Sequence, residues 1–191
     1  MVSVRTEFER FELIAGNIVG MLKYRGYKVD PEMKIRTAED LIKVYQLGEE
    51  VKVDLPKQII VFYTKEDKGV NIVKKLIVLM ESMKVKNAIF VTPEKLTGSG
   101  ATALRDSKGT HKIQHFLESE FLVSRIRGLD TPQYRLLTKE EAAKILRESE
   151  KDPRKLRQIV RPDPQAKYAG GKPGSIFEVV SSKEVFYRYL R

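Results

Sequence analysis

The chain has 191 residues, of which 41% are hydrophobic and 32% are charged, and this balance predicts one large or two small folded domains rather than a disordered chain. It contains no cysteine, which excludes disulfides, thiolate nucleophiles and iron–sulfur clusters. Lys and Arg number 36 against 26 Asp and Glu, and the formal net charge of +10 favours nucleic acid, an anionic membrane surface or an acidic protein as partner. No apolar run approaches the roughly 20 residues that a membrane span needs, and the N-terminus lacks the apolar core of a signal peptide, so a soluble intracellular protein is expected.

The first expected element is an amphipathic helix. Apolar residues recur at three- and four-residue spacing from Phe8 to Leu22, and Gly26 is the glycine expected to close the helix. A second helix is expected to begin at Thr37, because Asp40 stands three residues after this threonine cap. Its buried face would carry Leu41, Val44 and Tyr45.

A strand–helix–strand unit follows. Residues 58–63 form a continuous apolar run rich in β-branched side chains, which is typical of a strand buried on both faces. A charged turn leads to apolar residues at helical spacing over 70–83, and residues 88–91 form a second apolar run. Because the connections are short, this order predicts a βαβ unit with parallel strands, and hence an α/β domain with a mostly parallel sheet.

The next segment leads to a domain boundary. Turn-forming residues dominate 92–100, and we expect a short helix near 101–106, a helix over 111–119 and a strand over 121–123. Turn formers cluster again over 128–132. The sequence therefore predicts two domains, 1–128 and 129–191.

The second domain is expected to be small and of the α+β class. The capping-box pattern of Thr138 and Glu141 opens a helix that runs through Leu146, and Asp-Pro pairs at 152–153 and 163–164 open two shorter helices. After a glycine-rich turn over residues 170–174, two runs at 175–180 and 184–189 are typical of a terminal hairpin.

Candidate catalytic and metal-binding residues are few. Asp54, Glu66 and Lys68 are the residue types of a metal-dependent nuclease, in which carboxylates hold Mg²⁺ and a lysine orients the attacking water. Glu66 and Lys68 fall in a charged turn rather than within a strand, so a solvated turn is favoured and the nuclease is the alternative. His111 and His115 have the i, i+4 spacing of a zinc pair, but no third ligand accompanies them. No metal or cofactor is therefore expected.

The segment from Lys95 to Lys108 is the candidate contact with nucleic acid. It follows an expected strand, where α/β folds carry binding loops, and it combines hydroxyl groups, cations and glycines. Hydroxyls, backbone N–H groups and cations are the groups that bind phosphate without reading bases. A plain surface loop is an equally supported alternative. A second basic stretch, Lys151–Arg161, is interpreted as a solvated face in preference to a nucleic-acid contact.

Short motifs run in order through the last third of the chain: Thr131-Pro132-Gln133-Tyr134, Leu136-Leu137-Thr138-Lys139-Glu140-Glu141, Asp163-Pro164-Gln165-Ala166-Lys167-Tyr168, Gly171-Lys172-Pro173-Gly174-Ser175 and Tyr187-Arg188. This series resembles the assembly domain of the fifth subunit shared by the eukaryotic nuclear RNA polymerases, and the archaeal counterpart of that subunit is similar to the same region. Departures such as Tyr134 for the family histidine and Pro173 for the family arginine indicate a divergent member, from a large DNA virus or a fast-evolving eukaryote.

Five features of the first two-thirds are similar to the jaw domain of the same eukaryotic subunit. They are Tyr24-Arg25-Gly26-Tyr27, the βαβ unit and Leu96-Thr97-Gly98-Ser99, followed by His115-Phe116-Leu117 and Phe121-Leu122-Val123. The resemblance thus covers nearly the whole chain.

The resemblance implies a non-catalytic subunit of a DNA-directed RNA polymerase, without a cofactor and without a membrane, which is located in the nucleus or, if a virus encodes it, in the cytoplasm or the virion. Its C-terminal domain would dock on the largest subunit, and its N-terminal jaw domain would lie beside downstream duplex DNA. By resemblance, Thr97 and Ser99 approach the DNA backbone, and charge and proximity add Lys95, Arg105 and Lys108. The residues expected in the assembly contact are Pro132, Tyr134, Asp163, Pro164, Tyr168, Gly171 and Gly174.

Overall fold

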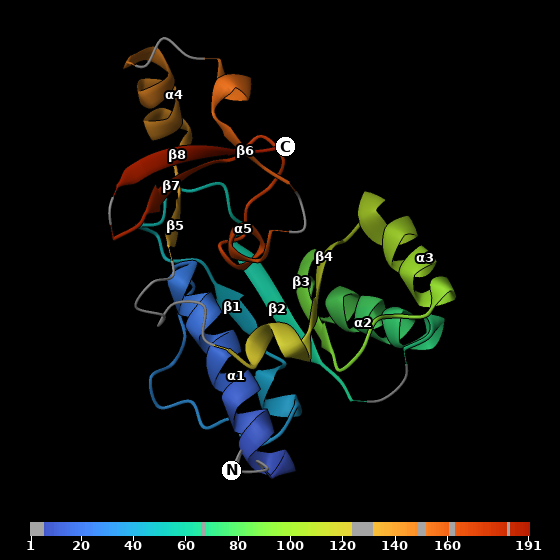
Figure 1. Ribbon diagram of the computed structural model, residues 1–191. Helices are drawn as coiled ribbons and strands as arrows, with labels where there is room; N and C mark the ends of the chain where they lie inside the picture. Colours follow the sequence, from blue (N-terminus) through green and yellow to red (C-terminus); the bar gives the residue numbers. More distant parts are fainter. Residues whose placement is uncertain (1–5, 66–67, 124–131, 149–151, 161–162, 183) are drawn as a thin grey trace. The chain divides into compact units, whose positions relative to one another are not determined.

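The computed structural model describes residues 6–65, 68–123, 132–148, 152–160, 163–182 and 184–191, and the chain divides into two compact units (Figure 1). The first unit comprises residues 1–23, 27–48 and 56–123, and the second comprises 24–26, 49–55 and 124–191. The expected boundary after residue 128 lies outside the described residues. Two short segments that the sequence division placed in the N-terminal domain, 24–26 and 49–55, belong to the second unit. Among the described residues, no helix is long and apolar enough to cross a membrane.

A four-stranded sheet is the centre of the first unit. Its strands lie in the order β1-β2-β3-β4, with bounds Val44–Gln46, Gln58–Tyr63, Asn87–Thr92 and Lys112–Leu117. β2, β3 and β4 are parallel, and β1 is antiparallel to β2. The chain is therefore of the mixed α/β class, with a first sheet that is mostly parallel.

Helices cover both faces of this sheet. α2 (Val70–Ser82) follows β2 and packs Leu76 and Met80 against Ile60 and Phe90. Successive side chains of a strand point to opposite faces, and Tyr63 stands three positions after Ile60 in β2. Tyr63 therefore lies on the face of the sheet opposite to α2, where its ring contacts Phe11 of α1 (Glu7–Tyr24). This two-sided cover explains why β2 and β3 are almost continuously apolar.

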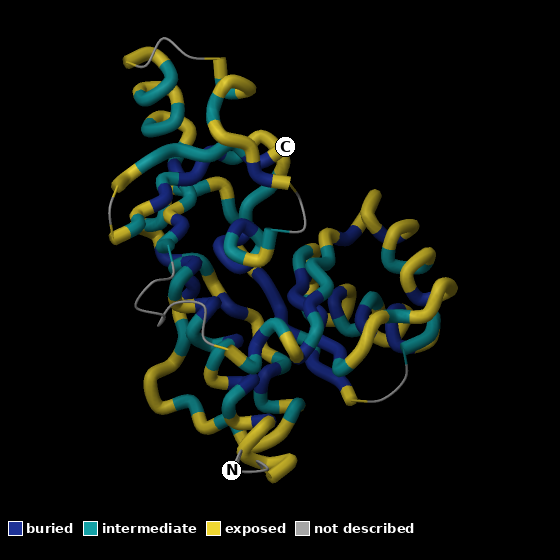
Figure 2. Tube along the Cα trace, in the orientation of Figure 1, coloured by how far each residue is buried: buried dark blue, intermediate teal, exposed yellow. Residues whose placement is uncertain are grey.

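The second unit contains its own sheet, in the order β5-β7-β8-β6. The bounds of these strands are Gln133–Leu136, Ile176–Val180, Val185–Leu190 and Arg157–Ile159. β7 and β8 form the expected antiparallel hairpin, and β6 lies parallel to β8. α5 (Pro164–Tyr168) contributes Ala166 to a core around Phe177, whereas α4 (Lys139–Glu148) has no buried residue (Figure 2).

Three of the expected elements are wrong. In place of the helix expected at Thr37, a 3-10 turn at Glu39–Leu41 leads into β1. The carboxylate of Asp40 accepts the backbone N–H groups of Arg36 and Thr37 and so holds the turn. Val44 and Tyr45, expected on the buried face of the helix, pair with β2 instead. The helix expected over 111–119 is instead strand β4, since an open edge of β3 offers a full parallel ladder to this segment. The strand expected over 121–123 is not formed, and residue 121 ends a 3-10 turn.

The loop expected over 92–100 is shorter than predicted. α3 begins at Gly98 and ends at Asp106, so two of the loop's glycines lie in its first turn. β5 and β6 have no counterpart among the expected elements.

Candidate nucleic-acid interface and assembly unit

The amino end of α3 holds the two hydroxyl residues that the sequence singled out. Thr97 caps the helix: its Oγ1 accepts the backbone N–H of Gly100 at 3.2 Å and lies 3.1 Å from Oγ of Ser99. The same hydroxyl donates to the carbonyl of Lys68 at 3.1 Å, and the Thr97 N–H donates to that carbonyl at 2.9 Å. Both hydroxyl residues are exposed at a helix end whose dipole favours an anion.

Gly100 lets this helix end approach the turn before α2. A Cβ at this position would come within 2.6 Å of the Lys68 carbonyl oxygen, a main-chain atom that cannot move away alone. The turn carries Lys68 itself, whose Nζ lies 2.5 Å from the Glu94 carboxylate. The close approach therefore brings an ion pair to the capped end of α3.

The three predicted cations are exposed but do not form one cluster. Lys95 precedes the amino end of α3, while Arg105 and Lys108 lie at and beyond its carboxyl end. A helix of nine residues spans roughly 13 Å, so the cations mark the two ends of an extended surface. Arg105 also donates to the Thr102 hydroxyl at 3.3 Å.

The two histidines do not form a metal site. Nε2 of His115 in β4 lies 2.7 Å from the hydroxyl of Thr92 in β3, and Nδ1 of His111 lies 3.0 Å from the Thr110 hydroxyl. Across the residues that the structure describes, no three His, Asp or Glu side chains gather in a way that suits a metal ion.

The two described residues of the nuclease alternative each pair with another side chain. Asp54 belongs to the second unit and lies 3.3 Å from Nζ of Lys172, while Lys68 belongs to the first unit and pairs with Glu94. Glu66 lies outside the described residues. These two ion pairs give the nuclease alternative no support.

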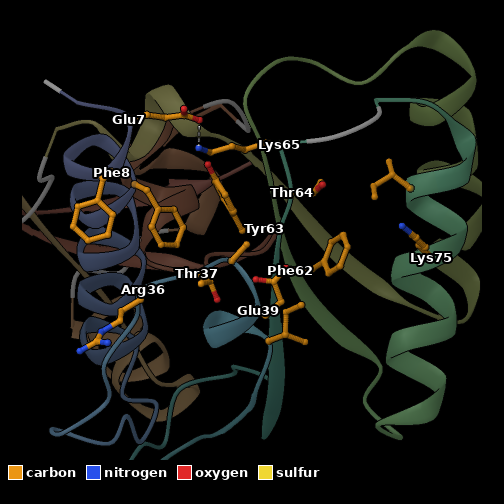
Figure 3. A pocket seen from close by; sticks show the side chains of 14 residues that line it. Glu7, Phe8, Arg36, Thr37, Glu39, Phe62, Tyr63, Thr64, Lys65 and Lys75 are labelled. Carbon is orange, nitrogen blue, oxygen red and sulfur yellow. Dashed lines mark hydrogen bonds and ion pairs between the residues drawn. The ribbon is translucent and has the colours of Figure 1, made fainter. Parts of the chain in front are cut away.

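A cavity of about 710 Å³ lies in the first unit, between α1 and α2 at the carboxyl end of β2 (Figure 3). Its walls are mainly apolar and include Phe8, Phe11 and Phe62, with an ion pair between Glu7 and Lys65 at the rim. The Lys65 ammonium group lowers the pKa of Glu7.

One wall of this cavity is held by a buried polar group. The hydroxyl of Tyr63 donates to the carboxylate of Glu118 at 2.6 Å, and Arg10 lies 3.0 Å from the other carboxylate oxygen. Burial and the Glu118 carboxylate raise the pKa of Tyr63, so its hydroxyl stays protonated. These groups serve the packing of α1 against the sheet.

In the second unit, the two tyrosines expected in the assembly contact are buried in its own core. Tyr134 is 6% exposed and packs against Phe177, and its hydroxyl accepts a hydrogen bond from Arg188 at 2.6 Å. Tyr168 is 4% exposed and its ring contacts that of Tyr24, whose hydroxyl donates to the carbonyl of Tyr134. Both side chains therefore act within the unit.

Asp163 and Gly171 also have internal roles. The carboxylate of Asp163 caps α5 by accepting the N–H groups of Gln165 and Ala166, both at 2.9 Å. A Cβ on Gly171 would come within 2.3 Å of the Phe177 ring.

The other three residues of the set lie nearer the surface. Pro164 and Gly174 are exposed, and Pro132 is half-buried just before β5. Gly174 has a φ of +90° at the turn before β7, and a Cβ added there would meet no atom within 4 Å.

Arg25 is a buried structural residue that the sequence pattern did not reveal. It is 4% exposed, its Nε donates to the carbonyl of Tyr168 at 2.8 Å, and an Nη donates to the carbonyl of Lys167 at 2.8 Å. These carbonyls lie at the carboxyl end of α5, where main-chain oxygens lack helical partners. The sequence feature that could have revealed this role is the position of Arg25 directly before Gly26, the glycine expected to end the helix.

The capping box at the start of α4 forms as expected. The Thr138 N–H donates to Glu141 at 2.8 Å, and the Glu141 N–H donates to the Thr138 hydroxyl at 3.1 Å. Arg135 joins Glu141 at 2.7 Å and Glu178 at 2.8 Å. The hydrogen bond from Arg135 and that from the Thr138 N–H lower the pKa of Glu141.

Comparison with known proteins identifies the second unit. The family described as RNA polymerase Rpb5, C-terminal domain, matches residues 130–190. The RPABC1 subunits of DNA-directed RNA polymerases I, II and III from Caenorhabditis briggsae and Caenorhabditis elegans are each 27% identical over 138 residues, or 72% of this chain. The Rpo5 subunit of DNA-directed RNA polymerase from Sulfurisphaera tokodaii is 41% identical over 64 residues, which cover 31% of this chain and 76% of that subunit.

The extent of these matches differs between the relatives. The chain spans 65% of the length of the two Caenorhabditis subunits. Its match to the shorter archaeal subunit covers more than two-thirds of that protein at 41% identity. The chain therefore belongs to the Rpb5 family of DNA-directed RNA polymerase subunits.

Proposed function

We propose that this protein is a non-catalytic subunit of a multi-subunit DNA-directed RNA polymerase. Its second unit fastens it to the largest subunit, and its first unit forms part of the jaw beside downstream duplex DNA. The proposal includes action in the nucleus, since the Caenorhabditis relatives are named as subunits of polymerases I, II and III.

The observation that carries this proposal is the match over the second unit. Most of the archaeal relative is covered by only 64 matched residues, and that relative is itself named as a polymerase subunit. A unit of this kind is therefore sufficient for membership in a polymerase, which supports the assignment of assembly to residues 130–190.

The proposed DNA contact is supported by the chemistry of α3. The exposed Ser99 hydroxyl and the amino end of α3, which Thr97 caps, are suited to a phosphate, and Lys95, Arg105 and Lys108 extend the surface toward both helix ends. Such contacts bind duplex DNA without reading its sequence.

The polymerase assignment is tested by purifying a tagged full-length chain from its native cell and identifying its partners by mass spectrometry. We expect recovery of the two large catalytic polymerase subunits in amounts comparable with the tagged chain. Recovery of the chain alone would refute the assignment.

The DNA contact is tested in the assembled polymerase with the variant Lys95→Glu/Lys108→Glu. We expect weaker, sequence-independent binding of downstream duplex DNA and a salt dependence whose slope falls by about 1 for each lost phosphate contact. The matched control, Lys23→Glu/Lys74→Glu, makes the same charge change at exposed lysines of α1 and α2. Equal affinity and slope in the two variants would place the DNA elsewhere.

A further inference from the structure

We propose that the groove between α4 and β8 is the surface by which the second unit holds its polymerase partner, and that it receives an acidic segment with bulky apolar side chains. This inference rests on the proposed function, because it names the contact surface of the assembly described above. It gives the surface role to α4 and its neighbours rather than to the tyrosines that the sequence suggested.

The apolar face of α4 is only partly covered by the described residues of this chain. Its half-buried residues, Glu141, Ala142, Ile145 and Leu146, share one face of the helix, and the remaining residues of α4 are exposed. No residue of α4 is buried, whereas α5 buries both Ala166 and Tyr168 (Figure 2). An amphipathic helix normally gains its stability by burying its apolar face, which α4 does only in part against the described residues.

The groove lies beside α4. It has a volume of about 440 Å³ and is formed by three elements of the second unit: α4, the segment that enters β6, and β8. Its lining residues are Ile145, Glu148, Lys155, Leu156, Arg157, Phe186 and Tyr187. Four of these seven carry large apolar or aromatic side chains, and all four are only half-buried, so the groove can bury further apolar surface.

Basic side chains lie at the rim of the groove. Lys155 and Arg157 line the groove, and Arg154 is exposed in the same segment. The carboxylate of Glu148 pairs with Lys144 at 3.7 Å, and the exposed Arg157 guanidinium pairs with Glu184 at 3.5 Å and lies 5.0 Å from the centre of the Phe186 ring. An acidic partner complements this rim, and electrostatic complementarity of this kind selects the partner and speeds its docking.

The comparison with the archaeal subunit bears on where the contact surface lies. The 64 residues that cover 76% of the archaeal subunit match the length of the domain at 130–190, so we place the surface that fastens the chain to the polymerase on this unit. Within the described part of the unit, the groove beside α4 combines an incompletely covered helix, aromatic side chains and cations. Aromatic and arginine side chains are also enriched at the centre of protein–protein interfaces.

The inference is tested with two double variants of the full chain that differ only in the groove. Ile145→Ser/Lys155→Glu alters two lining residues, and Leu146→Ser/Lys139→Glu makes the same chemical changes at α4 residues outside the lining. The two half-buried aliphatic residues are adjacent in one helix and both lysines are exposed, so the variants should unfold at similar temperatures.

Association is measured as the amount of catalytic polymerase subunits recovered with each tagged chain. We expect the groove variant to bind roughly a hundredfold more weakly than the wild type, from about tenfold for each substitution, and the control variant to bind within about threefold of it. If the wild type and both variants recover polymerase equally, the groove is not the contact surface, although the proposed function stands. If the wild type recovers none, the proposed function fails and this inference fails with it.

A labelling experiment tests the same surface without substitutions. Lysines of the free chain and of the purified polymerase complex are acetylated in parallel, and the extent of modification is read by mass spectrometry. We expect Lys155 to be protected at least fivefold in the complex and Lys139 to be modified equally in both. Equal modification of Lys155 in the two samples would overturn the inference.

Discussion

The replacement Gly171→Ala tests whether the core of the second unit is packed as the structure shows. The new Cβ would lie 2.3 Å from Cζ and 2.9 Å from Cε2 of Phe177, and 3.1 Å from a methyl carbon of Leu190. Ordinary contacts begin near 3.4 Å, so the ring would have to retreat by about 1 Å. Phe177 is fully buried and contacts the ring of Tyr134, so no open space receives it.

We expect Gly171→Ala to lower the free energy of unfolding by about 2–3 kcal/mol, in the upper range for an extra methyl group in a packed core. Chemical denaturation followed by circular dichroism measures the loss, and amide hydrogen exchange assigns it to the second unit. Gly174→Ala is the matched control, because its φ of +90° introduces backbone strain of about 1 kcal/mol without a steric overlap.

A second substitution separates overlap from other causes. Phe177→Leu removes the ring atoms that collide, so the double variant Gly171→Ala/Phe177→Leu should be more stable than the sum of the single effects by about 1 kcal/mol or more. The reasoning is refuted if Gly171→Ala changes stability by less than about 0.5 kcal/mol, or if it is tolerated better than Gly174→Ala.

Three further predictions concern individual polar contacts. Arg25→Leu should cost about 2–3 kcal/mol in the free energy of unfolding, because the carbonyls of Tyr168 and Lys167 each lose a hydrogen bond from this buried arginine, and Arg25→Lys should recover only part of this in the same denaturation assay. Glu141 has a lowered pKa in the folded state, so its ionised carboxylate stabilises the fold. This contribution to the free energy of unfolding is below about 1 kcal/mol, because the site is partly exposed. It is present above the unfolded pKa near 4.5 and is lost as the pH falls through the folded value. The stability gap between wild type and Glu141→Gln, measured from pH 7 to pH 3, should therefore close on acidification, and a gap that widens would contradict the assignment. Thr97→Val should destabilise the first unit by about 1 kcal/mol through loss of the α3 cap, whereas Ser99→Ala should have less than half that effect on thermal unfolding, so equal effects would argue against the cap.

The sequence was informative where local and tertiary preferences agree. The βαβ order, the terminal hairpin and the Thr138 capping box depend on short-range patterns, and the structure forms each of them. The sequence predicted β2 and β3 as strands because each is a short, almost continuously apolar run. Such a run is typical of a strand that is covered on both faces and has no polar side.

The errors arose where a distant partner decides the local structure. Residues 112–117 carry histidine, glutamine and lysine at spacings that suit a helix as well as a strand, and only the neighbouring β3 selects the strand. β5 and β6 are short strands that gain their hydrogen bonds from the hairpin of β7 and β8.

The candidate sites show the same division. Thr97 and Ser99 are two positions apart in the chain, so their convergence was predictable from the sequence. The burial of Tyr134 and the contacts of Arg25 bring together residues more than 100 positions apart and were not predictable without the fold.

The way the chain passes between the two units has a consequence for proteolysis. The path enters the second unit at residues 24–26, returns to the first, enters the second again at 49–55, and finally stays there after residue 123. A single cut near residue 128 therefore leaves a C-terminal fragment deprived of Tyr24 and Arg25, two residues that close its own core. Such a fragment should be digested faster than the same residues in the intact protein, and adding a peptide that contains residues 20–55 should restore its resistance.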